Sequence, residues 1–153
     1  MGRDRSPYIE EPDLEARPHR QVPVRERRIR AALLVLGLSQ LILAAWQGFA
    51  PGNFFRTFAA FGRANDHYVR DVATFYAALG VVLLLAVRRP RWRLSILAFA
   101  TLQYLLHFVN HVVDIGKSDP SWIGPADAIS IGLGAVLFGL TFLVVARSRR
   151  RGG

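Results

Sequence analysis

The segment WRLSILAFATLQYLLHFVNHVVDIG, residues 92–116, is apolar and long enough to cross a lipid bilayer. Its second half nevertheless carries five polar side chains, which we call the polar stripe: Gln103, His107, Asn110, His111 and Asp114. At about 100° per residue, these side chains fall within an arc of roughly 100° on one helix face. Because polar groups that face lipid are costly, the stripe is expected to face other helices or a wet cavity.

Three more apolar runs surround this segment, and the charged residues gather in the intervals between the runs. A net charge of +9 would also suit a nucleic-acid binder, but this arrangement is the pattern of a membrane protein. The expected spans cover residues 31–50, 69–87, 92–115 and 126–146. The sequence therefore predicts an all-α polytopic membrane protein, a four-helix transmembrane antiparallel bundle that contacts the lipid bilayer and no nucleic acid.

Both ends of the chain are polar. Residues 1–30 contain four prolines and mixed charges, which predicts a disordered basic tail, and residues 147–153 form a second basic tail. Of the 20 Lys and Arg residues, 16 lie in these tails and in the basic turn of residues 88–93 between the second and third apolar runs. The positive-inside rule then predicts a multi-pass protein of the cytoplasmic (inner) membrane with both termini in the cytoplasm.

A phenylalanine-rich segment follows the first span. Phe54, Phe55, Phe58 and Phe61 share one helix face, with Asn53 as the expected N-cap and Gly62 as the stop. This pattern predicts a short amphipathic helix in the membrane interface. The alternative is a re-entrant segment that lines a cavity.

Histidine and aspartate side chains converge at the end of the bundle opposite the basic tails. His107 and His111 are one helical turn apart, a spacing that helical metal sites use, and Asp114 continues the same face. Since the chain has no cysteine, the available nitrogen and oxygen ligands suit Zn, Cu, Mn or Fe. Haem is less favoured, because two histidines one turn apart cannot bind opposite faces of one iron. The predicted metal ligands are His107, His111, Asp114, His67 and Asp71, supported by a polar network of Gln103, Asn110, Arg70 and Asp127.

Three functions are compatible with these residues. The first is binding of a divalent metal or other cation. The second is a non-enzymatic accessory or assembly subunit, in which the stripe is a structural hydrogen-bond network and Arg70 neutralises Asp71 or Asp114. The third is a small membrane enzyme acting on lipid or quinone, for which a lateral opening lined by Tyr76, Tyr104 and Phe108 would be the structural sign. The sequence assigns no catalytic residue.

Small residues form a ridge on the fourth span. The residues Ala128, Gly132, Ala135 and Gly139 fall on one helix face. Small side chains let a neighbouring helix approach closely, which is how helices associate in lipid. The ridge is therefore expected to pack on another helix of the bundle, or on a partner in a homo-oligomer or a larger membrane complex.

The layout resembles that of the small DoxX-like four-helix bacterial membrane proteins. The shared features are Arg30 before the first span, Gly37 within it, the phenylalanine-rich segment from Phe54 to Phe61, and small residues in the later helices. The resemblance is architectural and covers residues 30–146. It implies a bacterial inner-membrane protein, sometimes with a redox or respiratory accessory role.

Overall fold

The computed structural model describes residues 23–150 of the chain, so most of the two predicted tails lies outside the described residues. The described residues form helices: α1 (Val24–Phe49), α2 (Pro51–Phe58), α3 (Asp66–Arg88), the short 3₁₀ turn η1 (Pro90–Trp92), α4 (Arg93–Val113) and α5 (Ile123–Arg150). The four longest of these helical segments are long and apolar enough to cross a membrane. The predicted four-span helical bundle is therefore confirmed.

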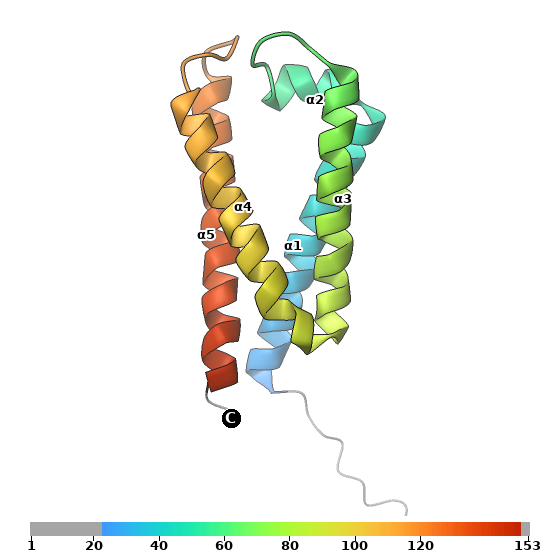
Figure 1. The fold of residues 1–153 in the computed structure, drawn as a ribbon, viewed down its shortest axis with the longest axis vertical. Helices are drawn as coiled ribbons and strands as arrows, with labels where there is room; N and C mark the ends of the chain where they lie inside the picture. Colours follow the sequence, from blue (N-terminus) through green and yellow to red (C-terminus); the bar gives the residue numbers. More distant parts are fainter. Residues whose placement is uncertain (1–22, 151–153) are drawn as a thin grey trace, which may run out of the picture.

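The long helices are arranged as two pairs. α1 packs along α3, and α4 packs along α5 (Figure 1). The pairs meet where α4 crosses towards α3, and they separate towards the opposite end (Figure 1). We call these two ends the arginine-rich end, where α1 begins and α5 finishes, and the loop end, which carries α2 and the α4–α5 link.

α1 begins at Val24 rather than at residue 31, so residues 24–30 are helical and not part of a disordered tail. Pro23 precedes the helix, and an ion pair of 2.7 Å between Arg30 Nε and Glu26 Oε1 spans one turn of it. The sequence prediction was wrong here because it ended the helix where the apolar run ends. Arginine and glutamate are good helix formers and extend the helix beyond that run.

α2 differs from the predicted helix at both ends. It begins at Pro51, a residue whose fixed φ suits the first helical turn, and it ends at Phe58. Asn53 is not the N-cap, because its side chain accepts a hydrogen bond of 2.8 Å from Trp46 Nε1 instead. Gly62, the expected stop, lies in the loop beyond the helix at φ +75°, a conformation that favours glycine.

Glycines set the close contact between α1 and α3. A Cβ atom on Gly80 would lie 2.9 Å from the carbonyl oxygen of Gly37, and one on Gly37 would lie 3.2 Å from the carbonyl oxygen of Gly80. The two backbones therefore touch at this crossing. Such close approach replaces the hydrophobic effect as the source of attraction between helices in lipid.

The small-residue ridge of α5 packs on α4 of the same chain. A Cβ atom on Gly132 would lie 3.0 Å from the Phe108 ring, and one on Gly139 would lie 3.6 Å from Thr101. The prediction that the ridge receives a neighbouring helix is confirmed, and that neighbour is α4. Association with a second protein through this face stays a prediction.

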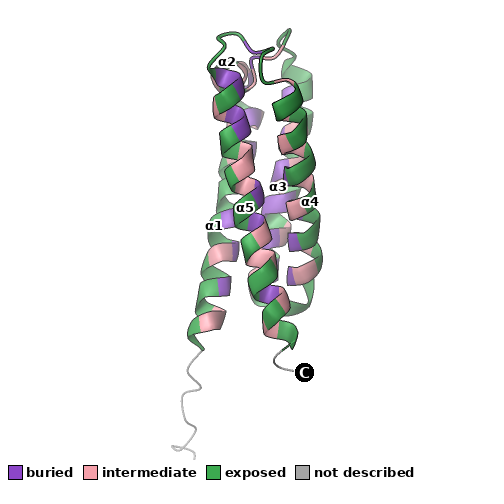
Figure 2. Ribbon diagram, turned by 90° about the vertical axis from the view of Figure 1, so that its left-hand side faces the viewer, coloured by how far each residue is buried: buried purple, intermediate pink, exposed green. Residues whose placement is uncertain are grey.

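The outer surface of the helices is largely apolar. Figure 2 shows exposed residues along the outward faces of the long helices. On α1 these include Leu34, Val35, Leu38 and Ile42, and every other long helix carries a similar set. Large apolar side chains on all sides of a helical bundle are expected where the surrounding solvent is lipid.

Candidate ligand cavity between the helix pairs

A cavity of about 740 Å³ lies between the two helix pairs and is partly open to the surroundings. All five α-helices contribute to its lining. Its middle is bordered by apolar side chains, among them Leu36, Leu43, Val72, Ile131 and Phe138. Pockets for organic ligands have volumes of roughly 300–1,000 Å³ and mostly apolar walls, so this cavity has the size and character of a small-molecule site.

The phenylalanines of α2 border the cavity at the loop end. Phe54, Phe55 and Phe58 are all lining residues. Trp46 of α1 meets Phe54 and Phe58 edge to face, with ring centroids 5.5 and 5.4 Å apart. The segment thus lines a cavity, and whether it lies in the membrane interface or re-enters the membrane stays a prediction.

Most of the polar stripe faces the same cavity. Four of its five members line the cavity wall: His107, Asn110, His111 and Asp114. Asp127 of α5 lies beside them, with its Oδ2 atom 3.8 Å from Nδ1 of His111. The expectation that the stripe faces other helices or a cavity is confirmed for these four residues. Gln103 is half-buried and is not among the lining residues.

Three buried polar atoms at the cavity have no hydrogen-bond partner within the described protein: Gln47 Oε1, His111 Nδ1 and Asp127 Oδ2. The gap of 3.8 Å between His111 and Asp127 is too long for a hydrogen bond. Asp127 and Gln47 are only 3% and 2% exposed. A buried polar group without a partner costs about 1–3 kcal/mol, and such groups call for an explanation. All three belong to residues that line the cavity, Gln47 from α1 and the other two from α4 and α5.

A hydrogen bond crosses from one helix pair to the other at the cavity. The Tyr104 hydroxyl of α4 donates to Oε1 of Gln40 in α1 over 2.9 Å, and both residues are buried. Tyr76 of α3 is a third buried polar residue of the lining. Two of the three residues expected at a lateral opening, Tyr76 and Tyr104, thus line the cavity, and the lateral opening itself stays a prediction. Phe108 is absent from the lining because its ring covers Gly132.

Gln47 was not predicted to be a site residue. The buried residues of α1 recur at spacings of three and four, and Gln40 and Gln47 fall on that same face. This periodicity was the available signal, since a polar side chain on the buried face of a transmembrane helix needs a partner.

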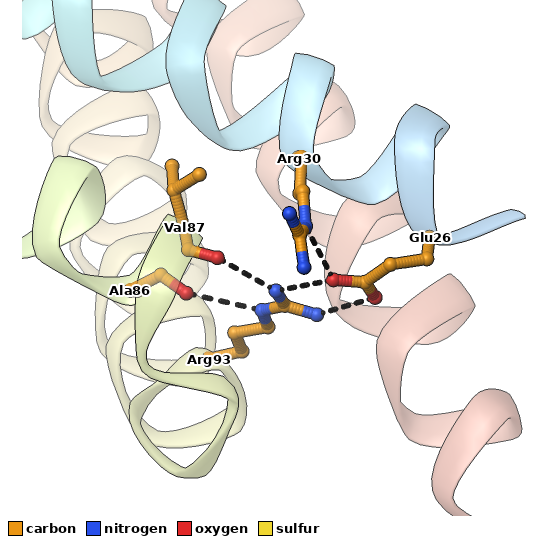
Figure 3. Close-up of polar contacts among 5 residues, drawn as sticks. All are labelled: Glu26, Arg30, Ala86, Val87 and Arg93. Carbon is orange, nitrogen blue, oxygen red and sulfur yellow. Dashed lines mark hydrogen bonds and ion pairs between the residues drawn. The ribbon is translucent and has the colours of Figure 1, made fainter. Parts of the chain in front are cut away.

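Arg93 fastens the helix pairs together at the arginine-rich end (Figure 3). It is 4% exposed, and its guanidinium donates two hydrogen bonds of 2.8 Å to the Glu26 carboxylate. It also donates to the carbonyl oxygens of Ala86 and Val87, at 3.0 and 2.9 Å, near the end of α3. From the sequence, Arg93 is one of the basic residues of the turn between the second and third apolar runs, so this contact was not predicted.

The loops join the helix pairs at the opposite end. Phe61, which follows α2, and Ser118, which follows α4, form an isolated antiparallel bridge. The backbone N–H of Asp119 donates to the carbonyl oxygen of Ala60 over 3.1 Å. The two pairs are thus held together at both ends, and the cavity lies between the Arg93 contacts and the loop contacts.

The structure does not bring the five predicted metal ligands together. His67 and Asp71 face each other across 3.5 Å on the outside of α3, where their side chains are 87% and 64% exposed. Asp114 instead forms an ion pair of 2.6 Å with Lys117. Within residues 23–150, no group of three or more His, Asp or Glu side chains is placed to hold a metal ion. The spacing along α4 was predicted correctly, but His67 and Asp71 lie on the exposed face of α3 and are not part of the cavity lining.

The supporting network also differs from the one predicted. Arg70 is exposed, and both of its expected partners are engaged elsewhere, Asp71 with His67 and Asp114 with Lys117. Asp127 does join the polar end of the cavity, as expected, through its position beside His111.

Fold and site together define a polytopic α-helical membrane protein with a cavity between two helix pairs. The sequence matches no protein-family model, and no curated protein or solved structure is detectably similar to it. The resemblance to DoxX-like proteins therefore stays a prediction.

Proposed function

We propose that this protein binds an amphipathic molecule of the lipid or quinone class in the cavity between its helix pairs. The observation that carries this proposal is the composition of the cavity. About 740 Å³ of space has apolar walls in its middle and unpartnered buried polar atoms at its loop end.

The polarity of the walls supports one orientation of the ligand. The apolar body lies beside Leu43, Val72 and Ile131, and the polar head lies beside His111 and Asp127. The cavity is partly open, and the proposed route into it runs from the bilayer between the α1–α3 pair and the α4–α5 pair. A molecule dissolved in the membrane can reach the cavity by this route without crossing water.

Bound molecules in detergent-purified protein test the proposal. Mass spectrometry of the organic extract is expected to show one lipid or quinone enriched to about one copy per chain over the surrounding micelle. The variant Ile131→Trp fills the cavity wall and should lose this molecule. The matched control Val136→Trp adds the same ring to an exposed position of α5 outside the lining and should retain it.

Equal amounts of the molecule in extracts of both variants, or no molecule enriched in the wild type, would overturn the proposal.

Metal binding is the second candidate, favoured by His107 and His111, whose ring centroids are 4.7 Å apart, and by Asp127 beside His111. Elemental analysis of the same preparations, with His111→Ala beside the wild type, separates the two functions. Stoichiometric metal that disappears in the variant would support the metal site.

The positions of the arginines support a cytoplasmic, inner-membrane location for the arginine-rich end. Arginines at the start of α1, in the link before α4 and at the end of α5 all belong to this end (Figure 1). We propose on the positive-inside rule that this end faces the cytoplasm, which places the polar part of the cavity on the outer side.

A further inference from the structure

One carboxylate of the cavity lining, that of Asp127, has no lysine or arginine partner among the described residues. The lining contains two histidines and three other ionisable charged residues: Asp114, Asp127 and Arg63. Asp114 is neutralised by Lys117, and Arg63 is an exposed residue. No Lys or Arg of the described residues forms an ion pair with Asp127, although its side chain is 5% exposed. Buried carboxylates are normally paired, because taking an isolated charge out of water is costly.

Two unpartnered atoms in the cavity lining favour a hydrogen-bond donor in the ligand. Asp127 Oδ2 and Gln47 Oε1 are both acceptors that lack a donor within the described protein. An ammonium group carries up to three N–H donors and a positive charge, so it can give Asp127 both a hydrogen bond and an opposite charge. A phosphate or carboxylate head would instead bring a second negative charge beside Asp127.

Aromatic rings surround the same end of the cavity. Phe61 meets His111 edge to face with ring centroids 5.2 Å apart, so it lies close to the His111–Asp127 pair. Trp46, Phe54 and Phe58 form an aromatic cluster in the adjoining wall. Faces of aromatic rings attract ammonium groups, and this attraction is strongest where water is excluded.

We infer that the bound molecule is an amphipathic amine, whose ammonium head lies against Asp127 and whose apolar chain extends along the cavity. This inference rests on the proposed function and deepens it by naming the head group. The carboxylate supplies the opposite charge, and the aromatic rings supply a wall that attracts an organic cation.

Three amphiphiles with one chain length and different heads test this inference. Decylamine, decanol and decanoate are titrated into the protein in neutral maltoside micelles at pH 7.5. Fluorescence of Trp46 reports binding, after Trp92→Phe and Trp122→Phe remove the other two indoles. Decylamine is expected to bind about 10- to 100-fold more tightly than decanol, the size of a charge-assisted hydrogen bond, and decanoate more weakly than both.

Two carboxylate variants provide the matched comparison. Asp127→Asn should abolish the preference for decylamine, whereas Asp71→Asn, which removes an exposed carboxylate at the same end of the bundle, should retain it. Thermal melting checks that both variants are folded. If Asp127→Asn does not fold, the ranking of the three amphiphiles on the wild-type protein still tests the inference.

The outcomes separate the two proposals. Equal binding of decylamine and decanol, or a preference for decanoate, would overturn the ammonium head but leave the amphiphile cavity standing. Failure of all three amphiphiles to saturate the Trp46 signal would overturn both.

Discussion

Arg93 shows how a single residue holds the two helix pairs of this protein together. It follows directly on η1, and its guanidinium satisfies both oxygens of Glu26 as well as two carbonyl groups near the end of α3. A planar guanidinium with five donors suits such a task, which a lysine could not perform. One side chain therefore connects α1, α3 and α4 (Figure 3).

Replacing Arg93 with methionine is expected to destabilise the protein by about 3 kcal/mol, because Glu26 and the carbonyl oxygens lose their buried partner. The measurement is unfolding in mixed micelles of maltoside and dodecyl sulfate, followed by circular dichroism. Arg91→Met is the matched control, since Arg91 is an exposed arginine two positions earlier. A loss of the same size in both variants would show that the contact with Glu26 contributes little.

The residues of the polar stripe show what could be predicted at this scale. Positions on one helix face follow from the helical repeat alone, so the common direction of His107, Asn110, His111 and Asp114 was predictable. The partners contributed by other helices were not. Asp127 was placed correctly, whereas His67 and Asp71 were not, because the rotation of one helix relative to another depends on packing that the sequence of neither helix contains.

At the scale of the element, the distance between α1 and α3 depends on two glycines. Gly37 and Gly80 lie face to face, and a Cβ atom added to either one would point at the backbone of the other. Gly37 was noticed in the sequence for its place in the first span, but its partner Gly80 was not. Identifying the pair requires the register between the helices, which becomes defined only when they pack.

Gly80→Ala is expected to destabilise the protein by about 1–3 kcal/mol, because the new methyl group would overlap the Gly37 carbonyl and the Leu41 side chain. Gly48→Ala is the matched control in α1, where the added atom would meet nothing within 4 Å. Since alanine favours the helix, this control should be neutral or slightly stabilising. The same micelle unfolding assay measures both, and a neutral Gly80→Ala would mean that the helices can separate at this point without cost.

The helix α2 was predictable from the sequence only in part. Its existence and its phenylalanine face were predictable from the spacing of Phe54, Phe55 and Phe58. Its start was not, because Asn53 has the residue type of an N-cap but uses its side chain to accept the Trp46 indole N–H. A tertiary contact thus replaced the local one.

At the scale of the whole molecule, the cavity exists because the helix pairs are joined at their ends and separated between them. Arg93 and Glu26 close the arginine-rich end, and the bridge between Phe61 and Ser118 closes the loop end. This arrangement leaves a cavity of about 740 Å³ between the pairs. In a bundle of four evenly packed helices, side chains would fill that space.

The double variant Phe61→Cys/Ser118→Cys is expected to form an intramolecular disulfide under mild oxidation. Residues paired across an antiparallel bridge have Cα atoms roughly 4.5–5.5 Å apart, within the range of disulfides, and the natural chain contains no cysteine to interfere. Protection from a maleimide-polyethylene glycol reagent, reversed by reductant, measures the bond. The link should also raise the thermal midpoint, since it fastens the two helix pairs.

The control pair Arg89→Cys/Ser118→Cys places the thiols at opposite ends of α4, which is about 30 Å long, and should remain fully labelled. Full labelling of the Phe61→Cys/Ser118→Cys protein as well would show that the loop end opens freely in micelles.

The sequence by itself determined the class of this protein, the number of its long helices, the phenylalanine helix after the first span and the polar face of α4. Each of these follows from short-range regularities, namely the length of apolar runs, the 3.6-residue repeat and the cost of charge in lipid. Only the tertiary structure decided the pairing of α1 with α3 and of α4 with α5, the burial of Arg93, and the meeting of Gln47, His111 and Asp127 at one cavity. These features depend on helix rotation and register. Exposed apolar faces cost nothing in lipid, so the hydrophobic pattern of one helix does not set its rotation or its register. Both are set by the fit of small residues and by a few polar contacts between helices.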